Sequence, residues 1–403
     1  MGIPTTRKQH RVWSGYPAKR RIGWSPITRN TSSDCWTGEA CKGLRRMNWL
    51  LLAVVGCLCS IGIAFIFAIG RQHGGGFALV WQNQTMWVVI GLVGMLVLAA
   101  IDYEWLGRGS HLIYVGTIAL LIAVLLIGRE IHGARSWIVL PGGKTLQPAE
   151  FAKLGVILPA AWLASRQSMH LGRWRHLFPF ALLLALPMAL IALQPDYGSA
   201  MVLVPIVVGI VFVAGLPARW LVYAGLIVAL LSPIIFHKVL AEHQRNRIRI
   251  FLNPSSDTTR SGWNARQSLL AVGSGGMSGK GFMNGTQNTL GYLPRNVSHT
   301  DFIFSVIAEE TGFVGSTTVI VLEVLILLLS VYIASQACDE FGRNVACGIA
   351  VMFCCHVYIN IGMTVGMAPI IGIPLPFVSS GGSFMLLTMG CIGILQSIYI
   401  RRR

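Results

Sequence analysis

The stretch SHTDFIFSVIAEETGFVGS, residues 298–316, places His299, Asp301, Glu309 and Glu310 at the start of a long apolar run. Only 12% of the 403 residues are charged, so an aspartate at this position needs an explanation. Asp301 could cap the helix that follows, because free amides and the helix dipole stabilise a carboxylate at a helix N-terminus. It could instead act as a general base, because it ends a basic segment where a substrate hydroxyl could come within hydrogen-bond reach. The sequence favours the base and leaves the cap open.

The segment before Asp301, residues 238–300, is the largest break in hydrophobicity and holds eight basic residues against two acidic ones. Arg245, Arg247 and Arg249 alternate, which places them on one side of a strand or spreads them around a helix. Guanidinium groups bind phosphate in a bidentate fashion, so these residues predict an anionic ligand. The alternative is an anchor for lipid headgroups.

A glycine-rich stretch, GSGGMSGKGFMNGTQ, contains Lys280 in the same segment. It fails the P-loop pattern, because Ser274 stands where the first glycine belongs and Gly281 follows the lysine. Its amides could cradle a phosphate, or the stretch could be a flexible connection. The preceding NARQSLLAVG predicts a short helix at the membrane surface.

Further polar residues lie at the ends of apolar runs. Glu150 and Lys153 in LQPAEFAKL are three residues apart, close enough to pair on one helix face, and a structural ion pair is the simplest interpretation. Trp137 in GARSWIVL is expected at the outer membrane interface, where tryptophan is common. Asp196 in QPDYGSA is a plausible helix cap.

Two other segments predict polar groups at membrane depth. Glu309 and Glu310 fall about two turns into a span, so at least one should face the protein interior. The stretch PIIGIPLPFVSSGGSFMLL has three prolines before Ser379, and broken backbone at this depth is tolerated where it is buried or lines a cavity. It predicts either a bent helix entry or the wall of an intramembrane groove.

These residues must be positioned by membrane helices, because 54% of the chain is hydrophobic and its mean hydropathy is +0.64. We predict an all-α integral membrane protein with about ten transmembrane helices and a large extracytoplasmic loop between helices 7 and 8. The expected spans are 49–70, 83–101, 110–128, 149–165, 176–193, 199–215, 217–237, 301–333, 344–370 and 377–400.

Charge sets the expected orientation. Residues 1–48 carry ten Lys and Arg against two acidic residues, which predicts a disordered, basic, cytoplasmic tail ahead of a membrane domain at 49–403. Ten spans return the C-terminus to the cytoplasm and place residues 238–300 outside. The net charge of +17 flanks the spans, so we expect contact with membrane lipids and no nucleic acid. No CxxC pair suggests a metal site.

The chain contains, in order, GARSWIVL, LQPAEFAKL, QPDYGSA, IFLNPSSD, GSGGMSGKG, LPRNVSHTDFIFSVIAEETGFVG and GIPLPFVSSGGS. This combination between ten spans resembles the SEDS family (shape, elongation, division and sporulation) and covers nearly everything but the tail. GTQNTLGYLP and GIPLPF look more like the rod-shape branch than the division branch. Two positions depart from the family pattern: Arg295 stands where a glutamate is usual, and Ser380 where a tyrosine is usual.

The resemblance implies a peptidoglycan glycosyltransferase that polymerises lipid II at the outer face of the bacterial cytoplasmic (inner) membrane. It implies a class B penicillin-binding protein and other elongation-complex membrane proteins as partners. Asp301 aligns with the family's essential aspartate and would activate the acceptor 4-hydroxyl in an inverting transfer. The candidate substrate-binding residues are Arg245, Arg247 and Lys280 for the pyrophosphate, with Trp137, Glu150, Lys153, His299 and Ser379 near the cavity. A divalent cation, Mg²⁺ or Mn²⁺, stays open at the pyrophosphate, although the sequence shows no dedicated metal cage.

Two other function classes use the same features. A lipid II flippase would need the groove and the charges but no base, and it would be favoured by charges on both faces of a central pathway. A scaffold that only recruits a penicillin-binding protein would have little use for a basic outer loop ending in an aspartate. A division-branch polymerase would share the chemistry of the elongation branch.

Overall fold

The computed structural model describes residues 46–73, 78–131, 134–139, 143–167, 174–234, 237–238, 242–253, 261–294 and 297–402. All of these lie within one compact unit, residues 40–403. The predicted basic tail falls almost entirely outside the described residues.

Each of the ten predicted spans coincides with a helix of the structure. These helices are α2 (Trp49–His73), α3 (Val80–Ala100), α5 (Ser110–Ile127), α6 (Pro148–Gln167), α7 (Phe178–Ala192), α8 (Tyr197–Val213), α9 (Ala218–Ile234), α13 (Ile303–Gln336), α14 (Glu340–Thr364) and α15 (Gly382–Ile400). Among the described residues, six of them are long and apolar enough to cross a bilayer by length and composition: α2, α3, α5, α13, α14 and α15. Helices α7, α8 and α9 are apolar but shorter.

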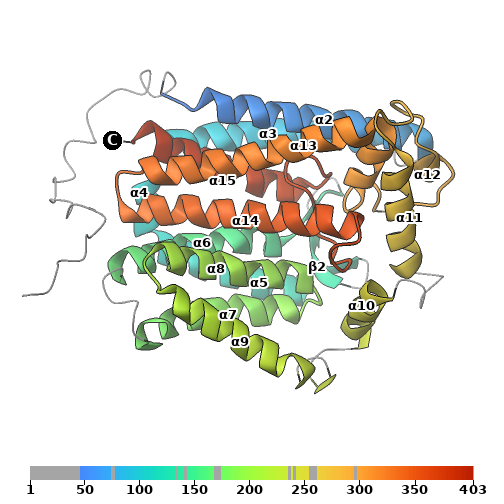
Figure 1. Cartoon of the computed structure of the whole chain (residues 1–403). Helices are drawn as coiled ribbons and strands as arrows, with labels where there is room; N and C mark the ends of the chain where they lie inside the picture. Colours follow the sequence, from blue (N-terminus) through green and yellow to red (C-terminus); the bar gives the residue numbers. More distant parts are fainter. Residues whose placement is uncertain are drawn as a thin grey trace, which may run out of the picture. The chain divides into compact units, whose positions relative to one another are not determined.

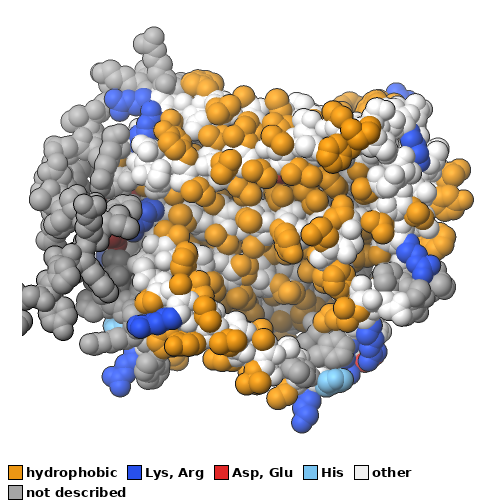
Figure 2. All heavy atoms as spheres, in the orientation of Figure 1, with side chains coloured by type: hydrophobic (Ala, Val, Ile, Leu, Met, Phe, Trp, Pro, Cys, Tyr) orange, Lys and Arg blue, Asp and Glu red, His pale blue; other side chains and the backbone are white. Residues whose placement is uncertain are grey.

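The surface of the bundle matches a bilayer. Figure 2 shows apolar side chains over the middle of the visible face, with Lys and Arg side chains gathered toward its two ends. Helices α3, α5 and α9 expose many apolar side chains, whereas α15 is buried along almost its whole length. A lipid-facing shell around a buried central helix is expected for a multi-pass membrane protein, since lipid tails solvate the outer apolar side chains.

One end of the bundle carries most of the irregular structure. Helices α10 (Glu242–Leu252), α11 (Ser261–Ser274) and the short α12 (Thr286–Thr289) gather there, opposite the C-terminus (Figure 1). The alternating arginines therefore lie on a helix, not on a strand, and the predicted short helix in NARQSLLAVG is confirmed as α11. Elsewhere α4 (Tyr103–Arg108) and the 3₁₀ turn Trp174–His176 connect spans.

A small antiparallel sheet between α5 and α6 was not expected from the sequence. Its strands are β1 (Arg129–Ile131), β2 (Ala134–Val139) and β3 (Thr145–Leu146), in the order β1-β2-β3. Arg129 pairs with Trp137 and Ile138 pairs with Leu146. Trp137 thus lies in a strand of this sheet.

The glycine-rich stretch docks onto a break in α13. Gly312 has a non-helical conformation (φ 67°), which interrupts the hydrogen-bond ladder of the helix. Lys280 N and Gly281 N donate to the carbonyls of Glu309 (3.0 Å) and Glu310 (2.9 Å), and Phe313 N donates to Gly276 O at 2.8 Å. These hydrogen bonds supply partners for backbone groups that the break in α13 leaves unpaired. The amides of Lys280 and Gly281 are therefore not free to bind a phosphate, and the stretch is not a loose connection there.

Helix α14 ends earlier than the sequence predicted. That helix stops at Thr364, and residues 365–381 run as irregular backbone to the start of α15 at Gly382. The predicted spans 344–370 and 377–400 were therefore too long at this end, because Gly366 just after α14 has a positive φ of 74° and Phe377 a positive φ of 59°, and neither conformation continues a helix.

Candidate active site at the Asp301 turn

Asp301 lies in a turn just before α13 and does not cap it. The N-cap residue is Phe302, and no side-chain cap hydrogen bond forms there. Asp301 N donates to Val297 O at 2.9 Å, and the amide of Asn360 on α14 donates to Asp301 O at 3.0 Å. These bonds hold the backbone of the half-buried Asp301, and its carboxylate does not cap α13, so the alternative of a helix cap is wrong.

The irregular segment before α15 clamps this turn from the other side. Ser379 Oγ donates to Thr300 O at 2.6 Å and accepts from Leu375 N at 2.8 Å. Ser380 N donates to His299 O at 3.0 Å. The structure therefore brings together His299, Asp301 and Ser379, which sequence analysis had placed in segments about 80 residues apart.

Glycine is required where this segment passes the carboxylate. Gly372 adopts a positive φ of 80°, and a Cβ atom there would lie 3.2 Å from Asp301 Oδ2. The backbone can approach the carboxylate this closely only because no side chain intervenes. This approach narrows the space around Asp301 on one side.

The electrostatics of Asp301 suit a base that works near neutral pH. Burial raises the pKa of its carboxyl to about 6, because the charged form loses solvation. A hydrogen bond from Thr300 and the positive charge of Arg247 act in the opposite direction and limit the rise. A carboxylate in this range is ionised at pH 7 yet basic enough to take a proton in a transition state.

Arg247 lies next to the turn. Its Nη1 donates to Ile371 O at 3.2 Å, one residue from Gly372. A pocket opens beside it, lined by Arg247, Ile250, Phe251, Ala265, Met363, Gly366, Ala368, Pro369 and Ile370. One cationic side chain at the edge of a mostly apolar pocket suits an anionic headgroup attached to a lipid.

The other candidate cations are held by carboxylates. Arg245 lies 3.6 Å from Glu242, which also pairs with Arg249 at 2.9 Å. Lys280 Nζ pairs with Glu309 Oε1 at 2.6 Å. Among the candidates for the pyrophosphate, Arg247 is thus the one whose charge acts on Asp301.

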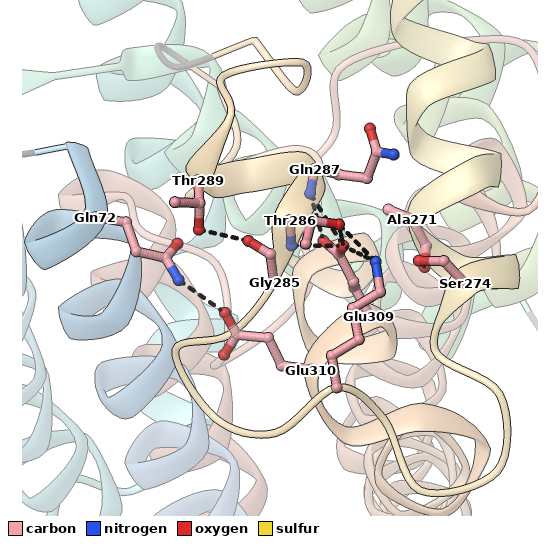
Figure 3. Close-up of polar contacts among 10 residues, drawn as sticks. Gln72, Ala271, Ser274, Gly285, Thr286, Gln287, Thr289, Glu309 and Glu310 are labelled. Atoms are coloured by element: carbon pink, nitrogen blue, oxygen red, sulfur yellow. Dashed lines mark hydrogen bonds and ion pairs between the residues drawn. The ribbon is translucent and has the colours of Figure 1, made fainter.

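Glu309 organises the loop that contains Lys280. Its carboxylate is fully buried and accepts hydrogen bonds from Thr286 N (2.8 Å) and Gln287 N (3.0 Å) as well as from the lysine. Figure 3 shows these contacts converging on the Glu309 side chain, while the neighbouring Glu310 points toward Gln72 of α2. Both glutamates face the protein interior, which confirms the expectation that at least one would.

The predicted Glu150–Lys153 ion pair is present and fully buried. Lys153 Nζ lies 2.8 Å from Glu150 Oε2 and 3.1 Å from His356 Nε2 on α14. Asp196 also caps α8 as expected, accepting from Ser199 N at 3.1 Å. Sequence analysis missed His356 and Asn360, two polar residues four positions apart in an apolar span, a spacing that places both on one face of the helix.

No group of three or more His, Cys, Asp or Glu side chains able to hold a metal ion occurs in the described ranges. Trp137 lies in β2, half-buried and opposite Arg129. It belongs to the sheet rather than to the Asp301 turn.

Comparison with known proteins places these features in a family. The sequence model of the FtsW/RodA/SpoVE family, described as cell cycle proteins, matches residues 43–403. The chain is 33% identical to peptidoglycan glycosyltransferase RodA of Treponema pallidum, an alignment covering 90% of this chain and 99% of the relative. It is 36% identical to peptidoglycan glycosyltransferase MrdB of Escherichia coli K12, covering 88% and 93%.

Solved structures agree with this placement. A chain of a peptidoglycan synthase complex that coordinates polymerization and crosslinking superposes with a TM-score of 0.76 at 30% identity, covering 88% of this chain and 98% of that one. The rod shape determining protein RodA of Thermus thermophilus superposes with a TM-score of 0.65 at 28% identity, covering 88% and 97%.

Proposed function

This chain belongs to the FtsW/RodA/SpoVE family of cell cycle proteins, and we propose that it is a peptidoglycan glycosyltransferase that polymerises lipid II for cell elongation and rod shape. The observation that carries the proposal is the Asp301 carboxylate, with its pKa raised to about 6, in a turn held by hydrogen bonds beside Arg247 and an apolar pocket. Lipid II combines an undecaprenyl chain, a pyrophosphate and a disaccharide peptide. The pocket suits the lipid, the arginine suits the pyrophosphate, and Asp301 suits the acceptor sugar.

In the proposed reaction Asp301 removes the proton from the acceptor 4-hydroxyl as its oxygen attacks the anomeric carbon of the donor. The bond from that carbon to the pyrophosphate oxygen breaks, and undecaprenyl pyrophosphate leaves with the bonding electron pair. A single displacement inverts the anomeric centre, so no carboxylate nucleophile is required. Arg247, with Arg245 nearby on α10, stabilises the negative charge that develops on the leaving group.

The other candidate residues have indirect roles or share their charge with a neighbour. Any action of Lys280 on the substrate is weakened, because the lysine is paired with the carboxylate of Glu309. Glu150 and Lys153 sit at the start of α6, and Ser379 and His299 hold the turn. A divalent cation, if used, would be carried on the pyrophosphate, because the described residues supply no cluster of ligands for it.

We propose an inner-membrane location with both termini in the cytoplasm and the Asp301 turn outside. Ten spans with a basic N-terminus support this orientation, and α10, α11 and α12 lie at the end opposite the C-terminus. A class B penicillin-binding protein is the proposed partner, supported by the likeness to a chain of a complex that couples polymerization to crosslinking. The elongation branch is supported by the rod-shape motifs GTQNTLGYLP and GIPLPF.

The experiment that tests this function places the purified protein and its cognate transpeptidase in vesicles containing fluorescent lipid II. Glycan strands should form with release of one undecaprenyl pyrophosphate per new linkage. Movement of lipid II between leaflets with no strand formation would overturn the proposal in favour of a flippase.

A further inference from the structure

A buried polar cluster, defined here as Glu150, Lys153 and His356, connects the spans α6 and α14 at the level of the irregular segment before α15. His356 on α14 is fully buried, and its ring stacks on Phe384 of α15, with centroids 4.7 Å apart and an angle of 27°. Lys153 of α6 lies over the same Phe384 ring at 5.5 Å. These contacts hold the His356 ring in one orientation.

The neighbours of His356 also fix its tautomer. Lys153 Nζ lies 3.1 Å from His356 Nε2, and an ammonium group can only donate, so Nε2 must accept. The ring hydrogen is therefore on Nδ1, which lies 3.1 Å from the carbonyl oxygen of Pro374 and donates to it. The lysine sets which nitrogen carries the hydrogen, and the hydrogen holds the Pro374 carbonyl.

Pro374 lies among the residues that hold the Asp301 turn. Its neighbour Ile373 accepts a hydrogen bond from Asn360 at 2.7 Å, and the same amide group donates to Asp301 O at 3.0 Å. On the other side Leu375 N donates to Ser379 Oγ at 2.8 Å, which in turn donates to Thr300 O. His356 and Asn360 are one helical turn apart on α14, so one face of this helix holds the backbone at Pro374, Ile373 and Asp301.

We propose that His356 is a positioning residue for the Asp301 reaction, acting through the Nδ1 hydrogen bond that holds the Pro374 carbonyl. The inference rests on the function proposed above and deepens it. Losing this hydrogen bond frees a carbonyl in a segment without regular structure, and the segment then shifts against Thr300 and Asp301. Substrate binding through Arg247 is retained, because within the described residues no hydrogen bond or ion pair joins α10 to His356.

Two amide variants test the roles of the two ring nitrogens of His356 separately. In His356→Asn the side-chain amide nitrogen occupies about the place of Nδ1 and can still donate to Pro374. In His356→Gln the amide reaches the place of Nε2, where its oxygen accepts from Lys153, and Pro374 loses its donor. Both variants are neutral and both lose the stack on Phe384, so their difference isolates the Nδ1 hydrogen bond.

The experiment measures kcat and KM for lipid II polymerisation with the cognate transpeptidase, for wild type, both His356 variants and Asp301→Asn. We expect His356→Gln to lower kcat roughly tenfold to a hundredfold at unchanged KM, as for a slightly misplaced catalytic group, and His356→Asn to keep most of the rate. Equal rates for the two His356 variants would overturn the inference. So would a loss in His356→Gln that only follows the fraction of protein still folded and binding lipid II.

The Asp301→Asn variant distinguishes this inference from the proposed function. If it polymerises at the wild-type rate, the base assignment fails, whatever the His356 variants do. If it is inactive while His356→Gln is as active as wild type, only the positioning role fails.

Discussion

The contacts of Glu309 predict what its substitution would do to the loop that contains Lys280. Glu309→Gln keeps the shape of the side chain and removes its charge. The carboxylate accepts from Lys280 Nζ at 2.6 Å, Thr286 N at 2.8 Å and Gln287 N at 3.0 Å, and it is fully buried. The variant oxygen can still accept these hydrogen bonds, but as a neutral group.

The expected cost follows from the number of these bonds. A hydrogen bond to a charged group stabilises by roughly 1.5–3 kcal/mol and a neutral one by about 1, so each of the three bonds loses about 1 kcal/mol. The sum of about 3 kcal/mol corresponds to roughly a hundredfold rise in the open population of the loop. The broken part of α13 would keep its bonds from Lys280 N and Gly281 N, so the helix itself should persist.

Hydrogen–deuterium exchange of the purified protein measures this directly. The amides of Thr286 and Gln287 should exchange roughly a hundredfold faster in Glu309→Gln than in wild type. Glu323→Gln is the matched control, because Glu323 is also buried on α13 but its carboxylate makes no hydrogen bond within the described residues. Unchanged exchange at Thr286 and Gln287 in the Glu309 variant would show that this carboxylate does not hold the loop.

Three further predictions concern the site and its support. Because only ionised Asp301 can act as a base and its pKa is about 6, kcat/KM for polymerisation should fall about tenfold per pH unit below pH 6. Arg247→Met removes a positive charge that lowers this pKa, so it should move the acidic limb of the pH profile to higher pH. A flat profile from pH 5 to 8 would contradict the role of Asp301 as the base. Gly372→Ala introduces a side chain at φ 80° and 3.2 Å from Asp301 Oδ2, so we expect roughly a tenfold loss of kcat, checked in the same assay against wild type. Lys153→Met leaves the buried Glu150 without its cation and should destabilise the fold by about 3–5 kcal/mol, seen as a lower unfolding temperature. Adding Glu150→Gln should recover most of the lost stability. No recovery in the double variant would contradict the stabilising role of the ion pair.

The spans could be predicted from the sequence because a bilayer imposes length and apolarity on each helix separately. All ten predicted spans overlap a helix, including α6, whose Glu150 and Lys153 pair as expected. Helix ends near prolines were placed less well, and the small sheet was missed because its strands are two to six residues long. Short strands owe their stability to neighbours, which a single sequence does not display.

The sequence suggested residues for the candidate site but not the hydrogen bonds that connect them. Asp301, His299 and Ser379 were identified, yet the hydrogen bond from Ser379 to Thr300 joins residues 79 positions apart and no local pattern announces it. The glycine-rich stretch was misread because its amides serve a break in α13 at Gly312, which only the fold reveals. His356 was overlooked because a single polar residue in an apolar run usually signals packing.

The role of Asp301 is tested by measuring polymerisation of lipid II by Asp301→Asn with the cognate transpeptidase, at a lipid II concentration that occupies wild type and variant equally. The amide keeps the size of the side chain and removes the base. We predict that the variant binds lipid II and makes no glycan strands. Strand synthesis at the wild-type rate would show that the acceptor hydroxyl is activated elsewhere, and it would contradict the assignment of Asp301 as the base.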